Sequence, residues 1–207
     1  LTEAVVKRST IPVTVKTRLG WDDQSKHIVE VAERLQDIGI AAISIHARTR
    51  SQMYKGEADW TLVGEVKNNS RMRIPVFGNG DIDSPEKAKL YKERYGVDGI
   101  MIGRASIGYP WIFREIKHYL ATGSLLPGPT IAERVEAARR HLAHSIVWKG
   151  EKLGVQEMRR HYTNYFRSLE GIKHFRAFLV TESDPAVLYD ILEQIGNHYA
   201  PQFLEPV

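Results

Sequence analysis

Four short apolar segments alternate with segments of helical periodicity in residues 1–122. The first, residues 12–18, alternates between an apolar face and a polar face that carries Lys16 and Arg18, and this period of two is typical of a half-buried strand. The other three are short apolar runs of the kind found in buried parallel strands, at residues 41–45, 74–77 and 99–102. Each of the four ends in polar or glycine-containing residues.

Helices are predicted between and after these strands, at residues 25–38, 60–68 and 84–96 and beyond Ala105. Strand–helix alternation indicates a parallel α/β architecture. Reactive groups at the carboxyl ends of strands are typical of a (β/α)₈ barrel. Because the chain holds four such strands rather than eight, we expect the C-terminal half of a TIM (β/α)₈ barrel, its last four βα units, over residues 1–122.

A Gly- and Pro-rich break at residues 123–129 marks the predicted domain boundary. No strand pattern follows it. Helical periodicity covers residues 130–149, 154–169, 172–180 and 184–198. We therefore expect a small all-helical domain over residues 130–207.

The composition excludes several kinds of site and gives no sign of a membrane protein. The chain has 207 residues, of which 43% are apolar and none is cysteine, which excludes disulfides, thiolate metal sites and a cysteine nucleophile within it. No run of about 18 apolar residues predicts a membrane span, and we expect a cytoplasmic protein. His141 and His144 lie one helical turn apart but lack a third ligand, so no metal site is predicted.

Two glycine-containing strand ends predict an anion site. They are residues 78–81, with Asn79, Gly80 and Asp81, and the pair Gly103 and Arg104. In (β/α)₈ enzymes phosphate binds at the loops after the seventh and eighth strands, where glycines admit backbone N–H groups and arginine binds oxygens. The alternative is that both are tight turns without a ligand.

Other strand ends carry groups that could meet a cofactor or an anionic substrate. Lys16 suits the pyrimidine edge of a flavin, and His46 could donate a hydrogen bond to a cofactor carbonyl. Arg48 and Arg50 follow in the next loop. A surface lysine, a structural histidine and solvated arginines are the alternatives.

Positive charge gathers in the helical part. Between Arg139 and Arg176 nine Lys or Arg face three Glu. Within this segment, residues 159–167 mix Arg159, Arg160 and Arg167 with aromatic residues, as RNA-binding surfaces do. Helical spacing equally supports a packed aromatic face with solvated arginines opposite.

Together these motifs resemble the tRNA-dihydrouridine synthase family, in its bacterial B-type branch. The motifs span nearly the whole chain: residues 13–21 (VTVKTRLGW), 45–50 (IHARTR), 56–58 (GEA), 78–82 (GNGDI), 101–105 (MIGRA) and 108–116 (GYPWIFREI).

The resemblance implies an FMN-binding barrel followed by a helical tRNA-binding domain. NADPH would reduce FMN, which would pass a hydride to uracil C6 of a base drawn out of its stack. The FMN-binding positions would be Lys16, His46, Asn79, Gly80, Asp81, Gly103 and Arg104. The tRNA contacts would be Arg48, Arg50, Arg159, Arg160 and Arg167.

One part of the family pattern has no counterpart here. The resemblance places the cysteine that protonates C5 in the N-terminal half of the barrel, so no catalytic residue is assigned in this chain. We expect a fragment that is inactive alone and that either self-associates or is poorly stable, because a half-barrel leaves two sheet edges exposed.

Two alternative functions stay open from the sequence: an FMN-dependent barrel oxidoreductase of a small metabolite, and a non-catalytic RNA-binding protein. The tRNA positions modified, the choice between NADPH and NADH, and the oligomeric state are left undetermined.

Overall fold

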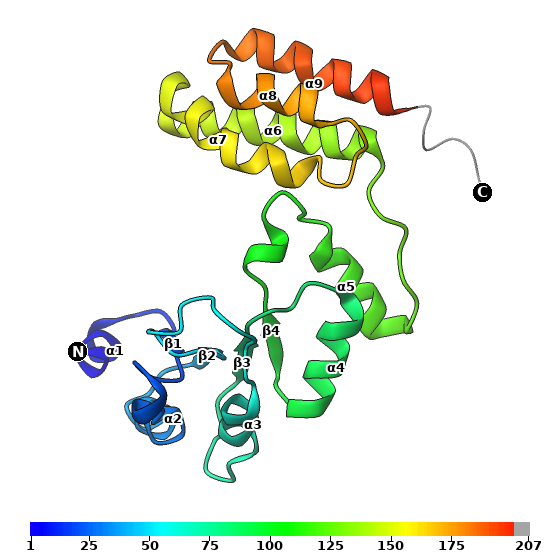
Figure 1. The fold of residues 1–207 in the computed structure, drawn as a ribbon. Coiled ribbons are helices and arrows are strands. Elements are labelled where there is room, and N and C mark those ends of the chain that lie inside the picture. Colours follow the sequence, from blue (N-terminus) through cyan, green and yellow to red (C-terminus); the bar gives the residue numbers. More distant parts are fainter. Residues whose placement is uncertain (201–207) are drawn as a thin grey trace. The chain divides into compact units, whose positions relative to one another are not determined.

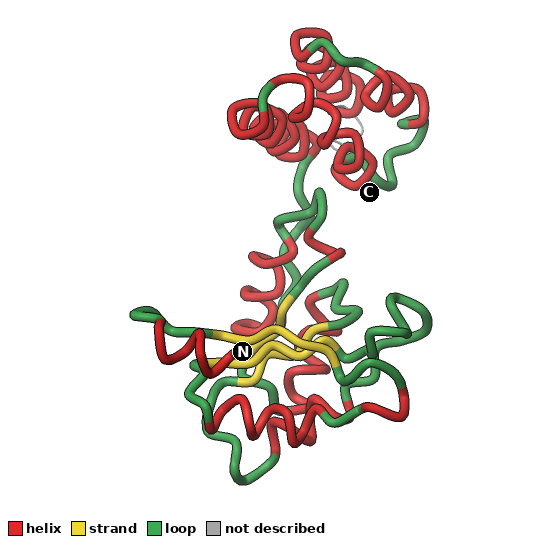
Figure 2. The backbone as a smooth tube through the Cα atoms, turned by 90° about the vertical axis from the view of Figure 1, so that its left-hand side faces the viewer, coloured by secondary structure: helices red, strands yellow, loops and turns green. Residues whose placement is uncertain are grey.

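The computed structural model describes residues 1–200 and contains one four-stranded sheet (Figure 1). Its strands are β1 (Thr14–Arg18), β2 (Ala42–His46), β3 (Val76–Asn79) and β4 (Gly99–Met101). They lie in chain order with every neighbouring pair parallel, side by side as Figure 2 shows. The predicted parallel α/β architecture is confirmed.

The register aligns the carboxyl ends of the strands. Arg18 of β1 pairs with His46 of β2, His46 with Asn79 of β3, and Asn79 with Met101 of β4. One row of residues thus crosses all four strands, and the segments that follow it share one edge of the sheet.

The third strand begins two residues later than predicted. Pro75 has no N–H to donate to the ladder, although its carbonyl accepts the N–H of Ile43 at 3.0 Å. The strand therefore begins at Val76 and includes Gly78 and Asn79, which the sequence placed in the following loop. The glycine marks a close approach inside the strand, described with the site.

Five helices accompany the sheet: α1 (Thr2–Arg8), α2 (Ile28–Asp37), α3 (Thr61–Asn68), α4 (Pro85–Tyr95) and α5 (Ile112–Thr122). In chain order α2, α3 and α4 pack against one another, and Figure 1 shows α2 and α3 below the strands. α2 begins later than predicted because the Asp22 carboxylate caps a short 3₁₀ turn, Asp23–Ser25. A second 3₁₀ turn, Arg104–Ser106, delays α5.

Four further helices follow: α6 (Ile131–Lys149), α7 (Glu151–Tyr165), α8 (Lys173–Thr181) and α9 (Pro185–Tyr199). α7 lies three to four residues earlier than predicted, since Gly150, at φ +78°, alone separates it from α6. Gly154 allows the two helices to approach closely: a Cβ there would lie 2.7 Å from the backbone of Ser145 and Ile146.

The described chain divides into two compact units, residues 1–105 with 115–125, and residues 106–114 with 126–200. Residues 106–114 thus group with the helical unit rather than with the sheet, unlike the predicted boundary. The helical unit has its own core, which includes Leu142, Met158 and Leu192. The predicted helical domain extends to residue 207, and residues 201–207 lie outside the described part. Within residues 1–200 no helix meets the length and apolarity that a bilayer crossing requires.

Candidate functional site

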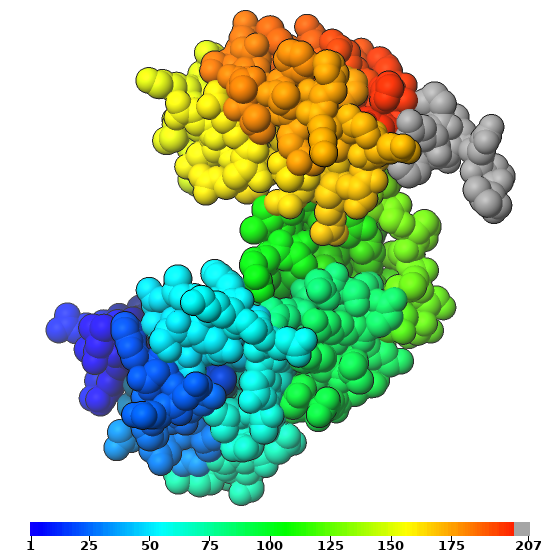
Figure 3. Space-filling model, viewed as in Figure 1, coloured from blue at the N-terminus to red at the C-terminus, as the bar shows by residue number. Residues whose placement is uncertain are grey.

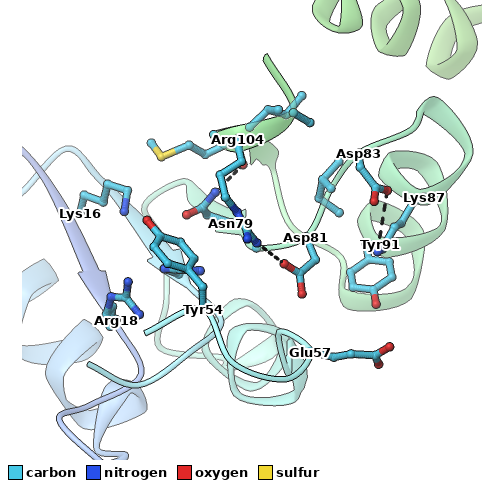
Figure 4. A pocket seen from close by; sticks show the side chains of 17 residues that line it. Lys16, Arg18, Tyr54, Glu57, Asn79, Asp81, Asp83, Lys87, Tyr91 and Arg104 are labelled. Atoms are coloured by element: carbon cyan, nitrogen blue, oxygen red, sulfur yellow. Dashed lines mark hydrogen bonds and ion pairs between the residues drawn. The ribbon is translucent and has the colours of Figure 1, made fainter. Parts of the chain in front are cut away.

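A cavity of about 440 Å³ opens at the carboxyl ends of the four strands (Figure 4). Every strand end or the segment after it contributes to its wall, which suits a small-molecule site in a parallel sheet. The charged and aromatic lining residues are Lys16, Arg18, His46, Tyr54, Glu57, Asp81, Asp83, Lys87, Tyr91 and Arg104, and Asn79, Gly80 and Gly103 also line it.

Two glycines shape the backbone beside the cavity: Gly78 inside β3, and Gly80 just after it, which lines the cavity. Trp60 is fully buried and fills the space beside Gly78, where a Cβ would lie 1.9 Å from the indole. At Gly80, whose φ is +134°, a Cβ would lie 2.7 Å from Ala58. The Trp60 Nε1–H also donates to the Gly80 carbonyl at 3.1 Å. Only glycine permits this approach, which turns the chain toward the cavity.

Asp81 links the ends of three strands. Arg48, after β2, donates from Nη1 and Nη2 to its two carboxylate oxygens at 2.8 and 2.6 Å. Arg104, after β4, donates from Nη2 at 2.8 Å, and the Ala58 N–H donates at 2.8 Å. Burial works to raise the pKa of Asp81, but the hydrogen bonds and charges of Arg48, Ala58 and Arg104 outweigh it and lower that pKa.

Two cations at the cavity, Lys16 and Arg104, have N–H groups that no residue of the described part of the chain accepts. The Lys16 ammonium has no ion pair or hydrogen bond there, and Figure 4 shows it pointing toward Asn79. Asn79 uses its Nδ2–H to donate to the Met101 carbonyl at 2.7 Å, which fixes the amide. Arg104 uses one N–H on Asp81 and is 55% exposed. The cavity therefore presents fixed polar groups and available positive charge.

His46 is buried, 6% exposed, at the end of β2. Burial, together with the charges of Arg18, Lys16 and Arg48, lowers its pKa to about 4. The imidazole is therefore neutral at pH 7. Within residues 1–200 it forms no hydrogen bond, and its ring lies 6.3 Å from that of Tyr54. A neutral imidazole at a cavity wall can donate one hydrogen bond to a ligand.

Two residues that the sequence did not single out as site residues, Tyr54 and Arg18, complete one side of the cavity. Tyr54 lies in the loop between β2 and α3, with the Arg104 guanidinium 4.6 Å and the Arg18 guanidinium 5.9 Å from its ring centre. Arg18 also donates to the carbonyls of Thr49 and Met53, which holds this loop. Residues of this loop, cyan in Figure 3, form part of the surface of the first unit. Arg18 could have been predicted as a cavity residue from the sequence, because it shares the polar face of its strand with Lys16.

The two arginines predicted after β2 have different surroundings. Arg48 is only 2% exposed and is held by Asp81 and by the Gly56 carbonyl. Its burial removes it from the set of groups that an RNA can reach, which corrects the prediction from the sequence. Arg50 is exposed and lies 6.0 Å over the Trp21 ring.

The arginines of the helical unit also separate into two kinds. Arg159 donates from Nη2 to the carbonyls of Thr181 and Glu182 at the end of α8, at 3.3 and 3.2 Å. It therefore ties two helices together. Arg160 is 68% exposed, with Glu157 at 3.8 Å, and Arg167 is exposed with its guanidinium 4.9 Å over the Tyr109 ring.

Of the two histidines considered for a metal, His141 has other partners. His141 lies 3.2 Å from the Tyr165 hydroxyl and stacks near His161, with ring centres 4.7 Å apart. Across residues 1–200, no group of three or more His, Cys, Asp or Glu side chains is arranged to hold a metal ion.

Comparison with known proteins gives consistent names. The chain is 45% identical to a tRNA-dihydrouridine synthase B of Pseudomonas aeruginosa over 84% of this chain and 52% of that protein. It is 46% identical to the Pseudomonas putida protein of that name over 84% of the chain and 51% of the relative. It is 38% identical to a probable tRNA-dihydrouridine synthase of Rickettsia conorii over 95% of the chain and 58% of the relative. The chain spans about half the length of the first two relatives.

Among solved structures, the alignment with a mandelate oxidase mutant covers 95% of this chain and 65% of that protein, at 15% identity and a TM-score of 0.34. The family model for dihydrouridine synthase (Dus) matches residues 1–198. This match extends over both units, from the strand ends that line the cavity to α9. The chain belongs to the dihydrouridine synthase family.

Proposed function

We propose that this chain is the C-terminal half of a cytoplasmic, FMN-dependent tRNA-dihydrouridine synthase that uses NADPH as reductant. The whole enzyme would reduce the 5,6 double bond of particular uridines in tRNA. The observation that carries the proposal is the cavity at the strand ends, where Lys16, Asn79 and Arg104 converge in a chain of this family. The four parallel strands would be the second half of a (β/α)₈ barrel.

The side chains and backbone present fit FMN. Arg104 has N–H groups left for phosphate oxygens, and Gly80 and Gly103 allow a ligand to approach the backbone. Lys16 offers a positive charge to the pyrimidine edge of the ring system, and neutral His46 offers a hydrogen bond. Bound FMN would supply the hydride that uridine reduction needs.

The remaining groups would serve the RNA. Tyr54 and Arg18 stand on the Lys16 side of the cavity, where an extruded base would have an aromatic face and a cation beside it. Arg50, Arg160 and Arg167 are exposed cations suited to phosphates. The proton for C5 would come from a cysteine in the part of the synthase outside this chain, which itself contains none.

The test uses the whole protein purified from its source. We expect a yellow protein that releases FMN on denaturation and that, with NADPH, converts uridines of unmodified tRNA into a nucleoside heavier by two hydrogens, detected by mass spectrometry. A Lys16→Met variant should keep the fold and lose most of the reduction.

Two outcomes would replace the proposal. FMN without reduction of tRNA would favour an oxidoreductase of a small metabolite. Binding of tRNA without any flavin would favour a non-catalytic RNA-binding protein.

A further inference from the structure

The carboxylate of Asp81 has no acceptor position left for a ligand. A carboxylate offers about four lone-pair sites on its two oxygens. Oδ1 accepts from Arg48 and Arg104, and Oδ2 accepts from Arg48 and from the Ala58 N–H, all at 2.6–2.8 Å. The carboxylate is also negative, so it would repel a phosphate. Asp81 therefore lines the cavity, but all of its hydrogen bonds are accepted from other residues of the protein.

Arg48 is the buried half of this arrangement. Its side chain is 2% exposed, and its fork binds both oxygens of Asp81 while Nη2 also donates to the Gly56 carbonyl. A bidentate pair of this kind fixes direction as well as distance. Asp81 also has a φ of +56°, in the left-handed region that few non-glycine residues adopt.

Arg104 is the exposed end of the arrangement. Its guanidinium is held at Asp81 by one hydrogen bond and lies 4.6 Å over the Tyr54 ring, while more than half of the side chain remains open. We propose that Asp81 and Arg48 are positioning residues, a charge pair that aims the free N–H groups of Arg104 at the phosphate of the flavin without touching the ligand. This inference rests on the proposed function.

The test compares two ligands that differ only in the phosphate. Dissociation constants for FMN and for riboflavin are measured by fluorescence on the whole protein after removal of its flavin. The variants are Asp81→Asn, Arg104→Met and the double variant. Asp37→Asn, which removes the same charge from an exposed residue at the end of α2, is the matched control.

We expect Asp81→Asn to weaken FMN binding roughly 10-fold, the scale seen when a partner that orients a binding group is removed. Riboflavin binding should stay within about 2-fold, since only the phosphate contact is affected. Because Asp81 acts through Arg104, the double variant should bind FMN no more weakly than Arg104→Met alone.

Equal loss of FMN and riboflavin affinity in Asp81→Asn, or fully additive losses in the double variant, would overturn the inference. If Asp81→Asn does not fold, Arg48→Lys decides in the same way, because lysine keeps the charge but not the fork. The wild-type protein reports on the proposed function separately. Failure to bind flavin contradicts that function, whereas equal binding of FMN and riboflavin contradicts only a phosphate site at Arg104 and the inference built on it.

Discussion

Trp60 and Gly78 show how one residue position supports the cavity. The indole is fully buried against the strand, and its N–H holds the carbonyl of Gly80. Any side chain at position 78 would have to displace the largest buried residue of the first unit. The backbone beside the cavity is therefore shaped by the absence of a side chain as much as by the groups that line the cavity.

Replacement of Gly78 by alanine should destabilise the fold by about 1–3 kcal/mol, the usual cost of overpacking a core. Urea unfolding of the whole protein would measure it. Gly196→Ala is the control, because in α9 its Cβ would meet Val135 at an ordinary 3.7 Å and alanine favours a helix by about 0.5–1 kcal/mol. Equal stability of Gly78→Ala and wild type would show that Trp60 can move.

His46 should make stability depend on pH. Its folded pKa of about 4 lies below the unfolded value of 6.5, so the unfolded chain takes up a proton first as the pH falls. Its contribution is intact above pH 6.5 and is lost between about pH 6.5 and 4, on the order of 3 kcal/mol. Unfolding free energies at pH 7 and pH 4.5 should therefore differ less in His46→Gln than in wild type. Identical differences would contradict a neutral His46.

The site was partly predictable at this scale. His46 and Asn79 end their strands and Lys16 lies two residues before the end of its own, in a pattern visible in the sequence, and parallel strands bring such ends together. The partnership of Arg48 with Asp81 was not predictable, because the two are 33 positions apart and their pairing depends on the path of a loop. Tyr54 escaped notice for the same reason, since it lies in that loop rather than in a periodic segment.

At the scale of elements, caps explain why the helix boundaries came close to the prediction. Ser84 accepts the Lys87 N–H and Gly96 ends α4 at φ +70°, as their residue types indicate. Boundaries differed where a local hydrogen bond competes with the helix, as with the Asp22 cap before α2. Such competition between short polar side chains and the helix is weakly encoded in apolar periodicity.

Thr130→Ala should destabilise the helical unit by about 1 kcal/mol. The Thr130 hydroxyl accepts the Glu133 N–H, which would lose this acceptor, whereas the N–H of residue 130 donates to the Glu133 carboxylate in the variant as well. Thermal unfolding followed by circular dichroism would measure the change. Thr130→Ser, which keeps the cap oxygen, should retain most of the stability, and equal losses in both variants would show that the cap contributes nothing.

At the scale of the whole molecule, positive charge divides into structural and exposed groups. Arg48 and Arg159 hold protein carbonyls or carboxylates, whereas Arg160 and Arg167 are exposed. A count of arginines in the sequence cannot distinguish these two groups, because it carries no information on whether each side chain is buried or exposed. The net basic character predicted for residues 139–176 therefore overstates the charge available to a polyanion.

Arg160→Ala should weaken tRNA binding and lower the slope of log affinity against log salt by about 1, as the loss of one phosphate contact does. Arg159→Ala should instead cost about 1–2 kcal/mol of stability, because it removes hydrogen bonds to the end of α8. Filter binding over a salt series and thermal unfolding separate the two effects. Lys7→Ala, an exposed cation of α1, is the control. If this slope is unchanged in Arg160→Ala, Arg160 does not contact a tRNA phosphate.

The pair of Arg48 and Asp81 also constrains how this chain can vary. Loss of Asp81 leaves the buried Arg48 charge without its carboxylate, at a cost of about 3–5 kcal/mol, whereas loss of Arg48 leaves Asp81 with Arg104 and the Ala58 N–H as partners. In a saturation mutagenesis screen position 81 should therefore tolerate fewer single changes than position 48, and survivors at position 81 should often carry a replacement of Arg48 as well. Replacement of Asp81 is thus expected to depend on a second change at position 48, so that the two positions vary together.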